Sequence, residues 1–390
     1  MMIKILEITP NFGFAQTFIG DRFDFMQQNG YEMHLICSPH AEFSTFVANK
    51  KIKAKAVDIP RLPNLAKDFN AIRIIVKYVK SNNIDCVVGH ADKGKLLAAI
   101  VARITGRKLI IWAHGTPLCF RKEGLKKWFF TLIEKFDTKK ASKVICVSPF
   151  VAEARALHDL ENNDKRVVPN KGSCSGMDCF GQFNPDNLKQ NTRLEQRQRF
   201  GLKDTDFVIG FCGRFTHDKG IDELIPAFQE LENRVGDGVK LVMIGKKDIR
   251  DAIKEETERM MDENPNIICT GYVNHSEIQN VYSIFDLFVL PTYREGLPYV
   301  LLENQSMGVP ILTTSITGSR DAIVEGQTGE YVNIDIDDIV TKISKMYYDS
   351  EYRMRLGKQA RQWICENFET HIVWSAIKQI YDSALNDEEK

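Results

Sequence analysis

The chain has 390 residues, of which 43% are hydrophobic and 27% are charged, with 52 basic and 52 acidic side chains. This length suits two domains rather than one core, and the composition excludes disordered and fibrous proteins. The nine cysteines form no C-x-x-C pair and no Cys/His cluster at zinc spacing, which indicates reduced thiols in a cytosolic protein.

The N-terminal half alternates apolar runs with helical patterns. Its first run, MMIKILEIT, leads directly into a strand without the regions of a signal peptide, so we expect a cytoplasmic protein. No stretch has about 18 uncharged apolar residues, so we expect no membrane-spanning helix. We predict strands at 3–9, 32–38, 85–90, 108–115 and 143–148, and helices at 21–29, 69–81 and 95–105. Strands that are apolar on both faces and separated by helices predict a parallel, doubly wound α/β domain.

This first half is also basic. Residues 1–185 contain 28 Lys and Arg against 17 Asp and Glu, a net charge of +11, so the remainder of the chain carries −11. Such a surface favours anionic partners, either phospholipid or a phosphorylated substrate. The sequence contains no nucleic-acid-binding module, so we expect no nucleic-acid partner.

The segment 121–143 concentrates this charge, with eight cations against three acids. Its apolar residues form a helical stripe, made of Leu125, Trp128, Phe129, Leu132, Ile133 and Phe136. One interpretation is a basic amphipathic helix that lies on an anionic membrane. The other, favoured by the width of the stripe, is that the apolar side packs onto the domain core and the cations face solvent.

A polar segment at 185–199 interrupts the pattern and is the candidate domain junction. The alternation then restarts, and the last 40 residues are predicted to be helical. We predict strands at 206–213, 240–245, 266–273, 286–292 and 310–314, and helices at 220–234, before 264 and after 295. Two similar α/β halves with a cleft between them follow, with ligands expected beyond the carboxyl ends of the strands.

The clearest strand-to-helix passage is DFVIGFCGRFTHDKGIDELIPAF. The strand ends at Gly213, and Arg214 and Lys219 lie in the connection before a helix. A helix N-terminus preceded by two cations suits a diphosphate, because the N–H groups, the helix dipole and the two charges all attract anions. Alternatively, Gly213 is a turn residue and the cations are solvated.

The stretch EGLPYVLLE follows another predicted strand. It places Glu295 in a loop and Glu303 inside the helix that follows. Ionised carboxylates only accept hydrogen bonds, so they suit the hydroxyl groups of a sugar or ribose. Alternatively, Glu295 caps the helix and Glu303 is solvated. Together with the diphosphate candidate, the two acids indicate one nucleotide-sugar ligand.

These two motifs, GRFTHDKG and PTYREGLPYVLLENQSMGVPIL, resemble the donor-binding half of the retaining glycosyltransferases of family 4. The segments GHADKGKLLAAIVARITGRKLIIWAHG, GSCSGMDCF and TGSRDAIVEGQTGEYV extend the resemblance to bacterial members that build capsule, O-antigen or other surface glycans. The resemblance implies the GT-B fold, two facing Rossmann-like domains with an interdomain cleft. It implies an acceptor-binding domain at 1–185, a donor-binding domain at 200–370, and a C-terminal helix at 371–390 that crosses back to the first domain.

The resemblance also implies roles for individual residues. Arg214 and Lys219 would neutralise the donor pyrophosphate and the charge that develops as it leaves. Glu303 would hold the ribose and Glu295 the transferred sugar. His114, after the strand KLIIWAHG, matches a histidine at the catalytic centre. The further donor-binding positions are Gly213, the backbone of Tyr272 and Val273 beside the base, and the N–H groups of Gly296 and Leu297 near the phosphate.

The implied reaction transfers a hexose or N-acetylhexosamine, with UDP as the expected nucleotide, to a glycan acceptor such as a lipid-linked intermediate at the inner face of the cytoplasmic membrane. The resemblance implies retention by front-face displacement, so Glu295 is not expected to be a nucleophile. Alternatives are a small soluble acceptor or a non-catalytic sugar-binding module.

No cofactor besides the nucleotide sugar is implied. Asp335 and Asp337 mimic a D-x-D metal signature, but they lie in VNIDIDDIV, where a helix cap is the favoured interpretation. We therefore predict no metal site.

Overall fold

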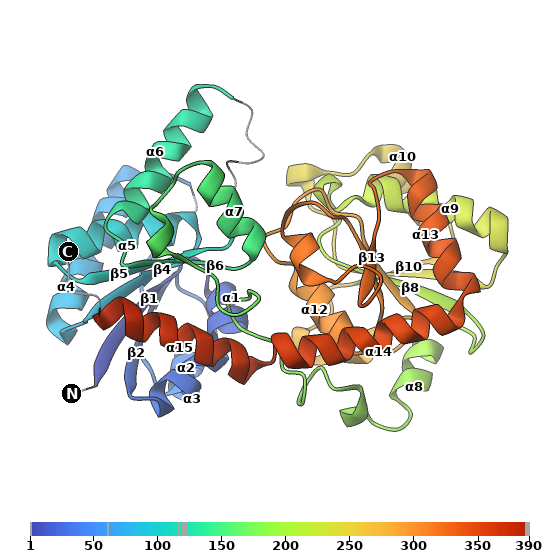
Figure 1. Ribbon diagram of the computed structural model, residues 1–390, viewed down its shortest axis with the longest axis horizontal. Helices are drawn as coiled ribbons and strands as arrows, with labels where there is room; N and C mark the ends of the chain where they lie inside the picture. Colours follow the sequence, from blue (N-terminus) through green and yellow to red (C-terminus); the bar gives the residue numbers. More distant parts are fainter. Residues whose placement is uncertain (1, 61, 116–117, 119–122, 387–390) are drawn as a thin grey trace. The chain divides into compact units, whose positions relative to one another are not determined.

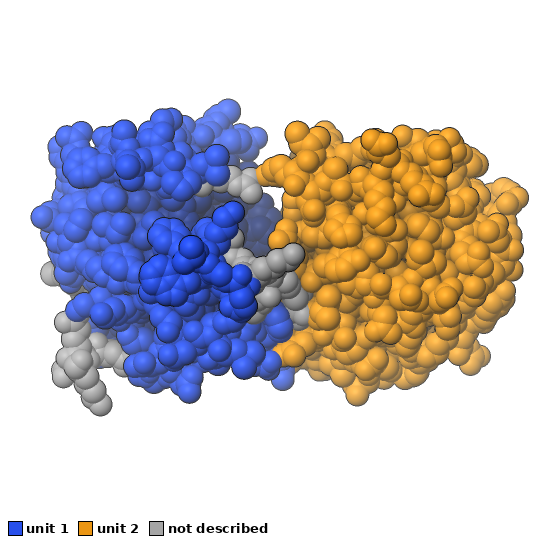
Figure 2. All heavy atoms as spheres, turned by 90° about the horizontal axis from the view of Figure 1, so that it is seen from above, with its two compact units in different colours: residues 1–176, 371–390 blue, residues 177–370 orange. Residues whose placement is uncertain are grey.

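A computed structural model describes residues 2–60, 62–115, 118 and 123–386 of the chain. The chain divides into two compact units, which are coloured separately in Figure 2. Unit 1 comprises residues 1–176 and 371–390, and unit 2 comprises residues 177–370.

Unit 1 is built on a seven-stranded sheet of order β3-β2-β1-β4-β5-β6-β7. All its neighbouring strands pair in parallel, as predicted. Its strands are β1 (Ile3–Ile8), β2 (Tyr31–Cys37), β3 (Lys53–Ala56), β4 (Cys86–Gly89), β5 (Lys108–Ala113), β6 (Lys143–Cys146) and β7 (Arg166–Val167). Its helices are α1 (Phe12–Phe14), the π-helix η1 (Ala15–Ile19), α2 (Gly20–Gln28), α3 (Phe43–Lys50), α4 (Leu65–Asn82), α5 (Ala91–Thr105), α6 (Leu125–Lys139), α7 (Pro149–Leu157), the 3-10 turn η3 (Asn163–Lys165) and α15 (Thr370–Asn386).

Unit 2 repeats the design with a six-stranded sheet of order β10-β9-β8-β11-β12-β13, also parallel throughout. Its strands are β8 (Phe207–Cys212), β9 (Val239–Ile244), β10 (Ile267–Gly271), β11 (Leu287–Leu290), β12 (Ile311–Thr313) and β13 (Gly329–Tyr331). Its helices are α8 (Thr192–Arg199), α9 (Ile221–Val235), α10 (Glu255–Glu263), α11 (Ile278–Tyr282), α12 (Tyr299–Ser306), α13 (Ile336–Tyr348) and α14 (Ser350–Asn367). The 3-10 turns of unit 2 are η4 (Pro185–Asn187), η5 (His217–Lys219), η6 (Ile249–Asp251), η7 (His275–Glu277) and η8 (Thr317–Ala322).

The central strands explain why both sheets are parallel. Every residue of β8 is buried, and β1 is buried from Ile5 to Ile8, so each of these strands needs cover on both faces. Parallel neighbours require a crossover, and the intervening helices supply that cover. Three short edge strands, β3, β7 and β13, were not predicted because they lack an apolar run long enough to stand out from a loop.

The strand order reverses once in each sheet, between β1 and β4 in unit 1 and between β8 and β11 in unit 2. At such a switch point the connections of two adjacent strands leave in opposite directions and open a crevice at their carboxyl ends. The residues that follow these strands are therefore the first place to look for a site.

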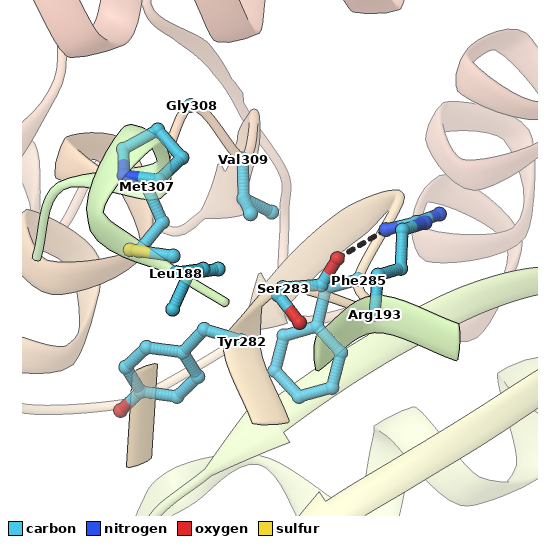
Figure 3. A pocket seen from close by; sticks show the side chains of 9 residues that line it. Leu188, Arg193, Tyr282, Ser283, Phe285, Met307, Gly308 and Val309 are labelled. Atoms are coloured by element: carbon cyan, nitrogen blue, oxygen red, sulfur yellow. Dashed lines mark hydrogen bonds between the residues drawn. The ribbon is translucent and has the colours of Figure 1, made fainter. Parts of the chain in front are cut away.

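The first boundary between the units lies at 176/177, earlier than the predicted boundary at 185. The polar segment 185–199, predicted to be the junction, belongs to unit 2. In it, Arg193 donates to the Ser283 carbonyl, as Figure 3 shows, and Arg197, buried, bonds the carbonyl of Asp206 at 3.0 Å. Arginines that satisfy buried backbone carbonyls make the segment polar in sequence, although it is packed in the fold.

The C-terminal segment 371–390 belongs to unit 1, and its described part is most of α15, drawn in red in Figure 1. Val373, Ile377 and Tyr381 of this helix are fully buried. The Tyr381 hydroxyl accepts from Trp112 Nε1 at 3.2 Å, and Lys108 Nζ donates to the Leu385 carbonyl at 2.6 Å. These contacts fasten α15 to β5. Residues 387–390 of the predicted helix lie outside the described residues.

Helix α6 corrects the favoured interpretation of segment 121–143, whose residues 121 and 122 lie outside the described part. The apolar stripe does not pack onto a core. Its exposed members are Leu125 (86%), Trp128 (62%), Phe129 (55%), Leu132 (45%) and Phe136 (40%). The buried side is polar instead and is made of Glu134, Asp137 and Thr138. In Figure 1, α6 stands out from the body of unit 1.

Ion pairs explain this inverted packing. Glu134 accepts from Lys95 Nζ of α5 at 2.5 Å and from Arg155 Nη1 of α7 at 2.8 Å. Burial opposes ionisation of Glu134, but the charges of Lys95 and Arg155 outweigh it and lower its pKa to about 2. Glu134 therefore fastens the polar face of α6 inward and leaves the apolar face outside. None of the helices among the described residues has the length and apolar character needed to cross a bilayer.

Candidate active site

The predicted donor residues of unit 2 gather at its switch point. Gly213 follows β8, and its N–H donates to the Ile244 carbonyl at 2.9 Å, which keeps the end of β8 aligned with β9. Lys219 lies in η5 after β8, and Glu295 lies in the loop after β11. The Lys219 Nζ and Glu295 Oε1 atoms are 2.5 Å apart, although the residues are 76 positions apart in sequence. Two predicted site residues thus form a direct ion pair.

Backbone contacts hold the two loops together. The Asp218 carbonyl accepts from the Thr292 hydroxyl and from the Tyr293 N–H, both at 2.9 Å. Between these loops Gly220 has φ +70°, and a Cβ at this position would lie 1.9 Å from the Pro291 carbonyl oxygen. Only glycine permits this approach, so the motif HDKG positions Lys219 against the β11 loop.

The turn that leads from Glu295 into α12 is also fixed by a glycine. The Gly318 N–H donates to the Glu295 carbonyl at 3.0 Å, and a Cβ on Gly318 would lie 1.7 Å from the Gly296 carbonyl oxygen. Gly296 and Leu297, predicted to present N–H groups to a phosphate, form this turn. Helix α12 then starts at Tyr299 with Pro298 as its N-cap.

Arg214, the other predicted cation, lies at the same edge of the sheet. Its Nη1 bonds Asp248 Oδ2 at 3.1 Å, its Nη2 lies 3.8 Å from Asp218 Oδ2, and its side chain is 49% exposed. Hydrogen bonds from Arg250 and from Arg214 hold the pKa of Asp248 well below its usual range. Asp248 and Asp218 therefore orient an accessible guanidinium.

Sequence reasoning missed a third cation, Arg294, immediately before Glu295. Its Nε donates to Asp218 Oδ2 at 3.1 Å, and its side chain is 52% exposed. Burial opposes ionisation of Asp218, but the Thr216 hydroxyl and the charges of Lys219 and Arg294 outweigh it and lower the pKa. Asp218 thus lies between two arginines. Arg214 and Asp218 both belong to the motif GRFTHDKG, but Arg294 comes from the β11 loop, and no local pattern connects it to Asp218.

Glu303 is 4% exposed on α12, so it is not a solvated residue on a polar face. Its Oε2 accepts from the Tyr282 hydroxyl at 2.7 Å, and its Oε1 lies 3.0 Å from His275 Nε2. Each carboxylate oxygen has two lone pairs, so the group retains capacity for the hydroxyls of a ligand. Sequence reasoning missed both partners, because neither forms a motif with Glu303.

The predicted base-reading residues lie in the same loop as His275. Tyr272 is 73% exposed and, with Val273, follows β10 directly. His275 therefore connects the Tyr272–Val273 backbone to Glu303 within unit 2. The pocket of Figure 3, about 320 Å³, is a different place: Tyr282 lines it, but none of the predicted site residues does.

In unit 1 His114 follows β5 and, itself partly exposed, joins a buried polar cluster. His114 Nε2 lies 3.1 Å from His90 Nδ1, and His90 Nε2 lies 2.5 Å from Glu7 Oε2. Glu7 is in β1, and His90 directly follows β4, so both lie at the switch point. His114 is therefore part of a hydrogen-bonded network.

Two further groups surround Glu7. Its Oε1 accepts from Arg22 Nη2 and from the Tyr381 hydroxyl, both at 3.0 Å. Burial opposes ionisation of Glu7, but its interactions with His90 and Arg22 outweigh it and lower its pKa to about 2. Burial lowers the pKa of His90, and it lowers that of His114 strongly, with the charges of Lys95 and Arg22 adding to the effect on His114.

Glu7 and His90 were missed in the sequence. A signal was present, because Glu7 is a lone acid in an otherwise apolar central strand and His90 ends the run DCVVGH. A buried ionisable residue in a strand core is rare unless it is paired.

Asp335 caps helix α13, since its side chain accepts from the Asp338 N–H at 3.1 Å, which confirms the predicted cap. The described residues include no group of three or more His, Cys, Asp or Glu side chains that could hold a metal ion.

Two family models match the chain, one described as Glycosyltransferase Family 4 over residues 16–170 and one described as Glycosyl transferases group 1 over residues 192–363. The chain is 29% identical to the capsular polysaccharide biosynthesis glycosyltransferase CapM of Staphylococcus aureus, over 94% of this chain and 93% of CapM. It is 24% identical, over 98% of both chains, to the UDP-Gal:alpha-D-GlcNAc-diphosphoundecaprenol alpha-1,3-galactosyltransferase of Escherichia coli.

Solved structures share the fold. A glycosyltransferase from Rickettsia africae ESF-5 superposes with a TM-score of 0.79 at 20% identity, over 99% of this chain and all of that one. Anabaena HepE in complex with UDP superposes with a TM-score of 0.78 at 18% identity, over 98% of this chain and all of HepE. The predicted architecture of two Rossmann-like parallel sheets is confirmed.

Proposed function

We propose a specific reaction for this chain, which belongs to the GT-B glycosyltransferases and has a family 4 segment followed by a group 1 segment. Its relatives include a glycosyltransferase named for capsular polysaccharide biosynthesis, which supports a nucleotide sugar as donor and a surface polysaccharide as product. In this proposal the chain transfers a hexose or N-acetylhexosamine from a UDP-sugar, with retention of configuration, to a lipid-linked glycan. The observation that carries this proposal is the Lys219–Glu295 ion pair at the β8/β11 switch point.

The charges at this site support a diphosphate donor. Arg214, Lys219 and Arg294 lie at the carboxyl ends of β8 and β11, each beside a carboxylate of the protein, and the half-exposed guanidinium groups of Arg214 and Arg294 can still donate to a pyrophosphate. UDP as the nucleotide is supported by the names of the relatives: the Escherichia coli enzyme is named for UDP-Gal, and HepE is described with UDP and with UDP-glucose. Glu303 then accepts from the ribose hydroxyls.

Transfer requires that the leaving diphosphate be stabilised as charge develops on it. Lys219 and Arg214 supply that stabilisation, and we expect them to do so without a resident metal ion. A carboxylate engaged by Lys219 at 2.5 Å is a weakened nucleophile, so we assign Glu295 to the transferred sugar as a hydrogen-bond acceptor. This argues against double displacement through a covalent intermediate on Glu295, and we propose retention by front-face displacement from the resemblance to family 4.

Helix α6 supports a lipid-linked acceptor. Its five exposed apolar side chains form a surface flanked by the exposed Lys126, Lys139 and Lys140. An apolar helix face bordered by cations binds an interface of anionic phospholipid, where lipid-linked glycans reside. We therefore place the protein peripherally at the inner face of the cytoplasmic membrane and assign acceptor binding to unit 1.

A small soluble acceptor is the second candidate. One relative, 23% identical over 81% of this chain, is named 2-deoxystreptamine N-acetyl-D-glucosaminyltransferase, so proteins of this architecture include one named for a small acceptor.

The experiment is a panel of UDP- and GDP-sugars incubated with lipid-linked and soluble acceptors, with nucleotide release as the readout and chelator added in parallel. We expect release from a UDP-sugar with the lipid-linked acceptor, a product of retained anomeric configuration by NMR, and loss of activity in Lys219→Ala. An inverted product would refute retention. Donor binding without turnover on any acceptor would favour a sugar-binding module.

A further inference from the structure

Three hydrogen-bonded side chains of unit 1, Glu7, His90 and His114, have no role in the proposed donor site. They come from the ends or cores of β1, β4 and β5 and are linked by two hydrogen bonds. We infer that Glu7 and His90 are positioning residues that fix the tautomer of His114, so that its Nδ1 accepts a hydrogen bond from a sugar hydroxyl of the substrate. The choice of substrate group rests on the proposed function.

The first step concerns the protonation state of Glu7, which is ionised. This side chain is fully buried, and its Oε1 already accepts from Arg22 and Tyr381. Arg22 in turn is anchored through Nη1 to the Cys174 carbonyl at 2.8 Å. A carboxylate held by a guanidinium and a hydroxyl is ionised, and an ionised carboxylate has no proton to donate. The 2.5 Å contact from Oε2 to His90 therefore requires that His90 Nε2 be the donor.

The second step is the state of His90. It is completely buried, it stacks on Trp112 with ring centroids 5.8 Å apart, and the Arg22 guanidinium lies 5.2 Å from the same indole ring. The Glu7 carboxylate favours a second proton on the imidazole, but burial, together with the nearby Arg22 charge, outweighs it and lowers the pKa of His90. A neutral imidazole with its proton on Nε2 has a lone pair on Nδ1. His90 Nδ1 is therefore an acceptor.

The third step fixes His114. Its Nε2 must carry the proton that His90 Nδ1 accepts, so the neutral ring has its lone pair on Nδ1. The edge of Phe14 packs against this ring, with centroids 4.8 Å apart and planes at 76°, and Trp112 stacks on it at 5.8 Å. Among the residues that the structure describes, none bonds Nδ1.

This tautomer selects a class of ligand. A lone pair on Nδ1 attracts a hydroxyl, which can donate, and repels the oxygens of a phosphate, which cannot. The opposite tautomer, with the proton on Nδ1, would favour a phosphate. The buried carboxylate of Glu7, which acts on His114 through His90, therefore makes His114 specific for the carbohydrate part of a substrate.

Two amide substitutions of His90 separate its hydrogen bond to Glu7 from its hydrogen bond to His114. In His90→Asn the amide oxygen takes the place of Nδ1 and still accepts from His114. In His90→Gln the amide nitrogen takes the place of Nε2 and reaches Glu7, but the acceptor for His114 is lost. Both variants bury one neutral amide, so each controls for the packing effect of the other, and their melting temperatures report on folding.

The readout is the imidazole ¹H–¹⁵N spectrum, which distinguishes Nδ1–H from Nε2–H, together with steady-state kinetics. We expect Nε2–H at His114 in the wild type and in His90→Asn, and a mixture of tautomers in His90→Gln. The kcat of transfer falls about 10–100-fold in His90→Gln, a loss of the size seen when a residue that orients a metal-binding histidine is replaced. It falls less in His90→Asn, and KM for the UDP-sugar changes little in both.

A wild-type His114 protonated on Nδ1 overturns the inference, as does a folded His90→Gln variant with the tautomer and kcat of His90→Asn. If the wild type turns over no sugar nucleotide, the proposed function fails. The tautomer is still read by NMR, and a titration with UDP-glucose and with inorganic phosphate then tests the hydroxyl preference. A shift of the His114 Nδ1 signal with phosphate but not with the sugar overturns it.

Discussion

The substitution Glu303→Gln tests the assignment of the donor site most directly. The Glu303 carboxylate is buried and accepts from Tyr282 and lies against His275. The amide keeps one acceptor oxygen of the same size but loses the charge and gains two N–H donors, which cannot accept from ribose. The change therefore alters hydrogen bonding with little change in volume.

The size of the effect follows from the kind of hydrogen bond that is lost. A bond to a charged group contributes about 1.5–3 kcal/mol and a neutral one about 0.5–1.5 kcal/mol, so the substitution removes about 1–2 kcal/mol of donor affinity. Since 1.4 kcal/mol is a factor of ten, Kd for UDP rises about 5–30-fold. The ribose is present in UMP as well, so Kd for UMP rises by a similar factor.

Calorimetry with UDP and UMP measures both constants. Lys219→Ala is the matched comparison, because it should weaken UDP binding more than UMP binding. Tyr282→Phe removes a hydroxyl that donates to Glu303 but leaves the carboxylate, so it should have a smaller effect than Glu303→Gln. Wild-type Kd values in a folded Glu303→Gln variant would refute the ribose assignment.

Three further predictions follow from other parts of the structure. Glu295→Gln lowers kcat more than it raises the donor Kd, because its partner Lys219 and the transferred sugar both lose an anion; equal effects on kcat and Kd, measured by kinetics and calorimetry, would argue against this role. Trp128→Ser with Phe129→Ser weakens binding to anionic vesicles, and salt weakens the wild type, in a sedimentation assay with neutral vesicles as control; unaltered binding would rule α6 out. Burial and the nearby charges, Glu134 and Asp92 among them, raise the pKa of Asp137 from 3.8 to about 8. Between these pH values the folded protein holds a proton that the unfolded chain releases, so the free energy of unfolding falls as the pH rises from 3.8 to about 8. Asp137→Asn removes this loss and raises the free energy of unfolding at pH 8 by at least about 1 kcal/mol, to be measured by urea titration at pH 5 and 8; equal stability of the two proteins at pH 8 would refute it.

Local pattern was sufficient to name much of the proposed donor site. The motif HDKG after a strand and the acids of EGLPYVLLE after another are short-range signals, because turn glycines, helix starts and strand ends depend on neighbouring residues. Lys219 and Glu295 could therefore be named in advance. Their ion pair could not be predicted from the sequence, because it depends on β8 and β11 being adjacent in the sheet.

Helix α6 shows where local pattern misleads. Its apolar stripe has the width of a core-facing surface, and nothing within the helix indicates that the stripe faces outward. Glu134 determines which face is buried, and its partners Lys95 and Arg155 are 39 and 21 positions away in the sequence. A buried charge is tolerated only beside its partners, so the tertiary contact determined which side of the helix is inside.

The sequence by itself determined the two α/β halves, the basic character of the first, and the residue types that we propose hold a nucleotide sugar, because periodicity and turn chemistry act over a few residues. Only the tertiary structure brought Glu7 to His90, 83 positions away, and added Tyr381 from the far end of the chain. A buried ionisable group takes its charge and its tautomer from the atoms around it, and the fold alone selects those atoms.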